Sequence, residues 1–213
     1  SGELGLPNGF GGVSIGFGND NRIGGEQADD GNLIAFNVGE GIRISGNQSV
    51  GNSILSNDIH SNTGLGINLG FDLVTMNDVD DSDSGSNGLQ NFPVLTGATA
   101  NPDSTEIQGE LISAANGEYR IDFFANLVCD PAGFVEGRKF LGFTTVTTDG
   151  AGNAVIDATV SGNVLGAGAL ITATATDTAG NTSEFSECFR AGSTITPNTF
   201  TVTHSGDGGP GSL

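Results

Sequence analysis

The sequence predicts an all-β protein in which a short right-handed parallel β-helix is followed by an Ig-like antiparallel β-sandwich. One observation behind this is an imperfect repeat of short aliphatic pairs in residues 31–70. Another is a series of alternating segments, separated by turn residues, in residues 92–191. The third is the composition: 36 of 213 residues are Gly, without a Gly-X-Y period, which favours a protein with many turns.

The repeat consists of aliphatic pairs next to Gly and Asn. Gly41-Ile42-Arg43-Ile44 recurs 25 residues later as Gly66-Ile67-Asn68-Leu69, and Gly31-Asn32 recurs 20 residues later as Gly51-Asn52. Degenerate copies are expected at residues 12–15 and 21–23. Units of this kind bury a core only by stacking. Alternation directs Ile42 and Ile44 inward together, and Asn side chains at equivalent corners can share amide hydrogen bonds along the stack.

The expected organisation has four segments. They are a β-helix with an open N-terminal end over residues 1–71, an acidic linker over 72–91, the sandwich over 92–191 and a tail over 192–213. Only about three coils are visible, which is close to the minimum for a stable stack. Because the ends of a solenoid expose unpaired strands, we expect something outside this sequence to cover the N-terminal end.

Seven strands are expected in the sandwich: Phe92–Ala98, Thr105–Leu111, Tyr119–Ala125, Lys139–Thr147, Ala154–Val160, Leu170–Asp177 and Ser183–Phe189. Turn signals such as Asn116-Gly117 and Asp149-Gly150 separate them. Seven short strands at this spacing favour an Ig-like topology.

The linker carries a run of carboxylates without a basic residue. Candidate metal ligands are Asp78, Asp80, Asp81, Asp83 and Asn87. Clustered carboxylate and amide oxygens are the ligands that Ca²⁺ takes, so calcium is the cofactor to expect. The loop is not an EF-hand, because its Asp spacing differs and the closing Glu is missing. The alternative is a solvated acidic linker without a metal.

The chain contains two cysteines, Cys129 and Cys188. An even count in an acidic chain of extracellular character favours one disulfide, and two buried thiols are the alternative.

The charge balance excludes some partners. Six basic residues face 25 acidic ones, a formal charge of −19. Such a surface repels phosphate backbones and anionic lipid headgroups, so nucleic-acid and membrane-surface roles are disfavoured. No apolar run approaches the ~18 residues of a membrane span. We expect an extracellular or cell-surface protein.

The sequence offers little for catalysis, and we expect no enzyme. Gly12-Val13-Ser14-Ile15-Gly16 fits the hydrolase elbow pattern, but the Gly-rich segment that follows cannot form the required helix. A polysaccharide lyase or hydrolase on the β-helix is an alternative that rests on fold analogy. Its candidate groups are Asp20, Asp29, Asp30, Glu40, Asp58, Arg22 and Arg43. The two histidines, His60 and His204, have no ligand-spaced partners.

Several motifs resemble a known family. They are Phe123-Phe124-Ala125-Asn126, Cys129-Asp130, Phe140-Leu141-Gly142, residues 173–177, residues 180–186 and the junction at residues 87–95. These residues are similar to the Ig-like module that follows parallel β-helices in large secreted bacterial surface proteins. Phe200–Thr203 with Gly209–Leu213 resembles the opening of the next β-helix module. The resemblance implies an adhesin-like tandem-repeat architecture and no assigned chemistry.

From this resemblance we expect an extracellular structural module, a repeat or subunit of a surface filament or long adhesin. The expected assembly strand is Thr199, Phe200, Thr201, Val202 and Thr203, which would complete the open coil of the next unit. The partners are then copies of the chain joined head to tail, or covalently linked neighbouring repeats. The alternative is an adhesion module that binds a polysaccharide or a host surface.

Overall fold

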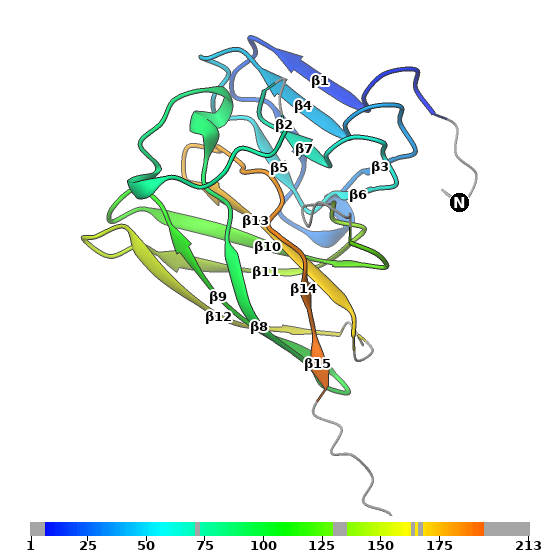
Figure 1. Cartoon of the computed structure of the whole chain (residues 1–213), viewed down its shortest axis with the longest axis vertical. Coiled ribbons are helices and arrows are strands. Elements are labelled where there is room, and N and C mark those ends of the chain that lie inside the picture. Colours follow the sequence, from blue (N-terminus) through cyan, green and yellow to red (C-terminus); the bar gives the residue numbers. More distant parts are fainter. Residues whose placement is uncertain (1–6, 71–72, 130–135, 163–164, 166–167, 194–213) are drawn as a thin grey trace, which may run out of the picture.

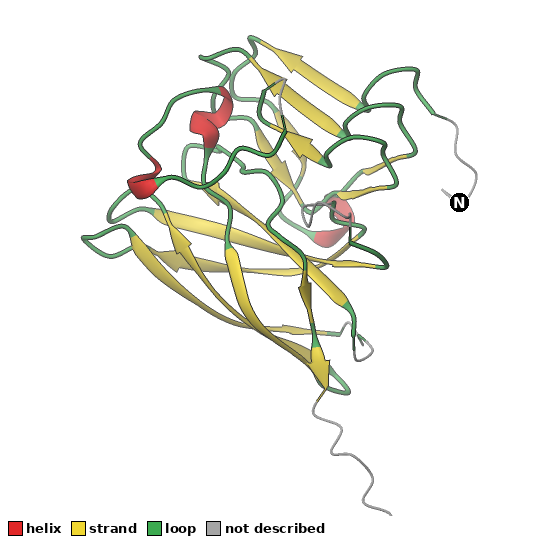
Figure 2. Ribbon diagram, in the orientation of Figure 1, coloured by secondary structure: helices red, strands yellow, loops and turns green. Residues whose placement is uncertain are grey.

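A computed structural model describes residues 7–70, 73–129, 136–162, 165 and 168–193. Within these ranges the regular structure is fifteen β-strands and three single-turn 3₁₀ helices, which confirms the all-β prediction. Figures 1 and 2 show two parts that lie against each other: a group of very short strands and, beside it, two sheets of longer strands.

The first part, called here the parallel stack, is built from β1–β7. Its strands are β1 (Val13–Gly16), β2 (Arg22–Gly24), β3 (Leu33–Ala35), β4 (Ile42–Ser45), β5 (Ser53–Leu55), β6 (Asp58–His60) and β7 (Ile67–Asn68). They form three separate sheets in the orders β1-β4-β7, β2-β5 and β3-β6, and every pair is parallel. Successive coils of the chain therefore lie on one another.

The register of the stack confirms one predicted spacing and corrects another. Ile42 pairs with Ile67, as the 25-residue repeat predicts. The 20-residue spacing between Asn32 and Asn52 is wrong as a structural repeat, because Asn32 lies over Asn57 instead. The degenerate copies form strands of the stack, since Val13 pairs with Ile42 and Ile23 pairs with Ile54.

Inside the stack, the alternating aliphatic residues form a narrow core. Ile42, Ile44, Ile54, Ile59 and Ile67 are almost completely buried. The corners need residues that tolerate positive φ. Gly24 has a φ of +80°, and a Cβ there would lie 2.1 Å from the Leu55 carbonyl oxygen, so only glycine fits at this corner.

Asparagine side chains run along the stack in three ladders. The ladders are Asn8–Asn37–Asn62, Asn21–Asn52 and Asn32–Asn57. In each step the backbone N–H and the side-chain Nδ2 of one asparagine donate to the Oδ1 of the asparagine one coil downstream, with Nδ2···Oδ1 distances of 2.8–2.9 Å. These bonds satisfy corner groups that no strand pairing satisfies.

The second part, called here the two-sheet part, contains eight strands. They are β8 (Val94–Ala100), β9 (Ser104–Ile112), β10 (Glu118–Asn126), β11 (Lys139–Thr147), β12 (Asn153–Ser161), β13 (Leu170–Asp177), β14 (Phe189–Arg190) and β15 (Gly192–Ser193). One sheet has the order β11-β10-β13-β14 and the other β12-β9-β8-β15. Residues of both sheets, such as Leu111, Phe123, Ile156 and Ile171, form one buried core.

Six of the seven strands expected here are present within a few residues of their predicted bounds, and the seventh is wrong. Ser183–Phe189 was expected as a strand, but only Phe189 and Arg190 form one. The Oγ atoms of Ser183 and Ser186 instead accept hydrogen bonds from the backbone N–H groups of Ala175 and Ala173 on β13. Serine hydroxyls therefore replace backbone carbonyls as acceptors, while the backbone N–H groups of Ser183 and Ser186 still donate to the carbonyls of Ala175 and Ala173. Glu184 and Phe185 point toward the stack.

The two-sheet part closes one end of the stack. The threonine side of β13 is buried, and Thr172, Thr174 and Thr176 are at most 7 % exposed. Phe124 and Phe185 belong to the same buried cluster as the stack isoleucines, and their rings meet edge to face with centroids 5.2 Å apart. The stack core is thus completed by residues far away in the sequence.

Candidate functional site

The two ends of the parallel stack differ in how their backbone groups are satisfied. At the end covered by the two-sheet part, side-chain oxygens accept hydrogen bonds from the backbone of the last coil. The pairs are Gly51 N with Asn181 Oδ1 (2.7 Å), Ile54 N with Thr182 Oγ1 (2.9 Å), Ser56 N with Asp122 Oδ2 (3.0 Å), Ser61 N with Glu136 Oε2 (2.6 Å) and Leu69 N with Glu184 Oε1 (2.8 Å). We call these acceptors the closed floor.

Two of the asparagine ladders also end on the closed floor side. Glu136 Oε1 accepts from both the backbone N–H and the Nδ2 of Asn62, each at 2.9 Å. Asn87 Oδ1 accepts from Asn52 N at 3.0 Å, and its Nδ2 donates to the carbonyl oxygens of Asn52 and Thr182. The N–H donors of Asn62 and the backbone N–H of Asn52, the last stack residues of these two ladders, therefore have acceptors at the end of the stack that the two-sheet part covers.

A buried ion pair contributes to the same interface. Arg120 Nε lies 2.6 Å from Asp122 Oδ1, and the two side chains are 15 % and 2 % exposed. The guanidinium also donates to Ser56 Oγ and to the Glu26 carbonyl, and it lies 3.9 Å from the centroid of the Phe143 ring. Burial raises the pKa of Asp122, while the Arg120 charge and hydrogen bonds oppose that rise.

The other end of the stack is open in the part of the chain that the structure describes. There β1, β2 and β3 are edge strands, each paired on one side only. The first asparagine of each ladder, Asn8, Asn21 or Asn32, is exposed, and no hydrogen bond from a described residue reaches its Oδ1. Free edges of this kind add further strands readily.

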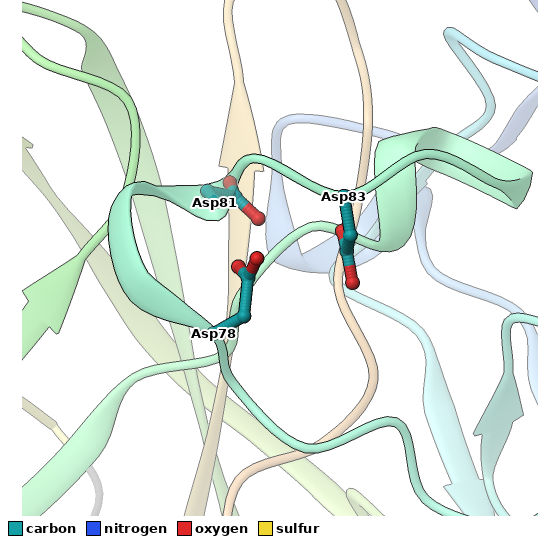
Figure 3. Close-up of side chains that lie close together, drawn as sticks. All are labelled: Asp78, Asp81 and Asp83. Atoms are coloured by element: carbon teal, nitrogen blue, oxygen red, sulfur yellow. The ribbon is translucent and has the colours of Figure 1, made fainter.

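Three of the predicted metal ligands come together in the linker (Figure 3). Asp78, Asp81 and Asp83 each offer one carboxylate oxygen, and these oxygens lie within 4.8 Å of one another. Asp78 Oδ1 is buried and has no hydrogen-bond partner. The group could hold a metal ion.

The loop around this cluster is held by backbone and side-chain contacts. Asp81 accepts from Ser113 Oγ and, at 3.0 Å, from Asn91 N, so it joins the linker to the two-sheet part. Burial raises the pKa of Asp81 above its ordinary value, and the neighbouring Asp83 and Asp78 charges add to that rise. The pKa of Asp83 is raised by burial and then by Asp78. Mutual repulsion of this kind is what a bound cation relieves.

Asp80 and Asn87, the other two predicted ligands, are placed differently. Asp80 is exposed and has a φ of +62°, and it is not a member of the three-carboxylate group. Asn87 is fully buried, and its carboxamide ends an asparagine ladder as described above.

The predicted disulfide is confirmed: Cys129 and Cys188 are bonded, with 6.1 Å between their Cα atoms. It joins the beginning of the loop after β10 to the residue before β14. The predicted assembly strand, residues 199–203, lies outside the described residues, as does His204.

Several of the candidate catalytic groups have structural contacts. Ser14 lies within strand β1, so no nucleophile elbow forms there. Glu40 pairs with Arg43 at 2.7 Å, and Asp58 Oδ1 accepts from the Phe140 backbone N–H. His60 is buried beside the Phe36 ring; burial and then the Arg138 charge lower its pKa, against Asp58.

Several residues that shape these ends were not singled out in the sequence. Glu136, Asp122 and Glu184 are acceptors of the closed floor, and no local motif distinguishes them from other acidic residues. One signal was available: the Phe123-Phe124 pair places bulky side chains on both faces of β10, which predicts a strand covered on both sides.

Among the described residues, no helix is long and apolar enough to cross a membrane. Neither the protein-family models nor the curated proteins include a match to this chain.

Proposed function

We propose that this chain is an extracellular structural module: a right-handed parallel β-helix whose C-terminal end is covered by an Ig-like sandwich, used as a repeat or subunit of a surface filament or long adhesin. The observation that carries the proposal is the asymmetry of the stack. One end is closed by the acceptor side chains of the closed floor, whereas the outer edges of β1, β2 and β3 have no partner among the described residues.

The asymmetry supports head-to-tail assembly. An open edge that differs from the rest of the surface makes a heterologous contact, and heterologous contacts that do not close produce a filament. The same edge would serve covalently linked repeats, in which the neighbouring repeat covers it. The resemblance to secreted bacterial surface proteins agrees with either arrangement.

Other features suit a mechanical role outside the cell. The asparagine ladders fix the register of the stack, and the Cys129–Cys188 bond closes a long loop. Disulfides persist in oxidising compartments. The charge of −19 would keep neighbouring fibres apart and in solution.

The proposal is tested by size-exclusion chromatography with light scattering over a concentration series, followed by negative-stain microscopy. We expect oligomers of increasing length built from the 21.4 kDa chain, and thin filaments at high concentration. A monomer at every concentration would refute self-assembly and leave the covalent arrangement. Closed rings of fixed size would refute the filament.

We also propose that the Asp78–Asp81–Asp83 group binds calcium, because Asp78 Oδ1 is buried without a partner beside two further carboxylates. Ca²⁺ prefers oxygen ligands, and a bound ion would fix the linker between the stack and the two-sheet part. Calcium at about 100 times its Kd should add roughly 2.7 kcal/mol of stability, and so raise the Tm by about 5–10 °C over the same protein in chelator.

Two variants make this calcium test specific. Asp78→Asn should abolish the calcium-dependent rise in Tm, because it removes the charge at the buried oxygen. Asp157→Asn, at an exposed position on β12, is the matched control and should keep the rise. An equal Tm with calcium and with chelator in the unmodified protein would overturn the proposal.

A further inference from the structure

The polarity of the asparagine ladders defines what can extend the stack. In all three ladders the upstream asparagine donates and the downstream Oδ1 accepts. The open end therefore presents Oδ1 acceptors on Asn8, Asn21 and Asn32. An incoming coil must place two donors, a backbone N–H and a side-chain NH₂, over at least one of them. Asparagine is the residue that supplies both from one corner.

A segment that can supply these donors lies in the C-terminal residues outside the described ranges. Residues 194–213 include Asn198-Thr199-Phe200-Thr201, in which an asparagine is followed two positions later by a large apolar residue. The same order occurs at Asn32-Leu33-Ile34 and at Asn57-Asp58-Ile59, where the structure shows the asparagines in a ladder and the isoleucines facing inward.

The corner of β3 fits this segment best. β3 stays extended from Leu33 to Ala35, whereas β2 reaches a positive φ at Gly24 directly after Ile23. On β1 the ladder residue, Asn8, lies five positions before Val13, so the order does not match there. At β3, Ile34 is 8 % exposed while Ile59 below it is 1 % exposed, and an inward Phe200 would cover Ile34.

The position of the last described strand indicates that the segment comes from another molecule, and the low charge of the tail permits its approach. Residues 194–213 contain a single acidic residue, Asp207, in a chain of charge −19, so this tail approaches the acidic body with little repulsion. The last described strand, β15, lies at the end of the two-sheet part that points away from the stack (Figure 1). The tail therefore starts at the pole opposite the open edge of its own chain.

We propose that residues 198–201 of a second copy add a parallel strand to the free edge of β3, with Asn198 donating to Asn32 Oδ1 and Phe200 covering Ile34. The inference rests on the proposed head-to-tail assembly and names the segment and the ladder that form the joint. Each chain would accept one tail at its open edge and donate one tail from its opposite pole.

Full-length variants test the joint by light scattering. Asn198→Asp removes the NH₂ donor and places a carboxylate against Asn32 Oδ1, and Asn153→Asp on β12 is its charge-matched control. Asn32→Ala removes the acceptor, and Asn21→Ala on the neighbouring ladder is its control. We expect the Asn198 and Asn32 variants to be monomers of 21.4 kDa and both controls to assemble.

Mixing the two monomeric variants gives the sharpest outcome. The Asn198→Asp chain keeps a working edge and the Asn32→Ala chain keeps a working tail, so the mixture should form a one-to-one dimer and nothing longer. If the unmodified chain assembles and Asn198→Asp assembles equally well, this joint is refuted while the proposed function stands. If the unmodified chain stays monomeric, self-assembly and the joint are both refuted. The tail variant remains decisive should Asn32→Ala fail to fold.

Discussion

Replacing Arg120 by methionine tests the interface between the stack and the two-sheet part. Arg120 neutralises Asp122, whose side chain is 2 % exposed, and its guanidinium covers the Phe143 ring. Methionine keeps much of the length and the packing over the ring but removes the charge and the hydrogen bonds. Asp122 then keeps its bond from the Ser56 backbone N–H as a buried, unpaired carboxylate.

The expected loss of stability is about 3–5 kcal/mol, the usual cost of breaking a buried ion pair from one side. Urea unfolding followed by circular dichroism measures it, since the chain has no Trp and a single Tyr. The matched control is Arg22→Met. Arg22 is 51 % exposed and 3.8 Å from Glu26, so its loss should cost less than about 1 kcal/mol.

A second substitution separates charge from packing. In Arg120→Met with Asp122→Asn, no buried charge remains, so most of the lost stability should return. The reasoning is refuted if Arg120→Met costs no more than Arg22→Met, or if the double variant is less stable than Arg120→Met alone.

The same variant should show a distinctive pH dependence. Burial raises the pKa of Asp122, and in Arg120→Met no arginine opposes the rise. The folded state then binds a proton more tightly than the unfolded state, so stability falls as pH increases. Arg120→Met should therefore gain stability as pH decreases from neutral toward the ordinary aspartate pKa of about 3.9, and the gain should exceed that of the unmodified protein.

Three further predictions concern the closed floor and the disulfide. Glu136→Ala should lower the free energy of unfolding by about 2–4 kcal/mol, because three N–H donors of Ser61 and Asn62 lose a charged acceptor. A change in the urea midpoint no larger than that of an exposed Glu→Ala variant would contradict this. Asn87→Ala should cost about 2–3 kcal/mol, measured in the same way, since it leaves the backbone N–H and C=O of Asn52 unpaired in a buried site. Cys129→Ser with Cys188→Ser should cost about 4 kcal/mol by the chain-entropy model for a 59-residue separation, and an unchanged thermal midpoint would refute it.

Local pattern was enough to predict the parallel stack. The alternation at Ile42 and Ile44 determines which side chains face inward, and asparagines one coil apart meet as the corner argument requires. The 20-residue spacing between Gly31-Asn32 and Gly51-Asn52 gave a wrong repeat, because the same Gly-Asn dipeptide occurs at two different corners of the stack. Only the pairing of Asn32 with Asn57 and of Asn52 with Asn21 distinguishes them.

Contacts between distant segments were not predictable in this way. Glu184 and Phe185 lie in the segment Ser183–Phe189, which was predicted to be a strand, yet they face the stack. Glu184 accepts a hydrogen bond from the Leu69 backbone N–H there, and Phe185 packs in the core of the stack. The group of Asp78, Asp81 and Asp83 could be predicted because several aspartates lie close together in the linker sequence. Asn87 was also predicted as a metal ligand, but its side chain binds Asn52, the second asparagine of the ladder that begins at Asn21, and this contact could not be read from the local sequence.

The closed floor also determines when the chain can fold. The core of the stack is complete only once Phe124, Glu136 and Phe185 are in place, and these residues follow the last stack strand by 56 residues or more. A nascent chain that ends at residue 70 therefore leaves the core of the stack exposed at this end. The backbone N–H groups of its last coil also lack the acceptors of the closed floor. Long-range contacts of this kind slow folding and couple the two parts. Both parts should then unfold in a single transition, and proteolysis should release no stable fragment limited to the first seventy residues.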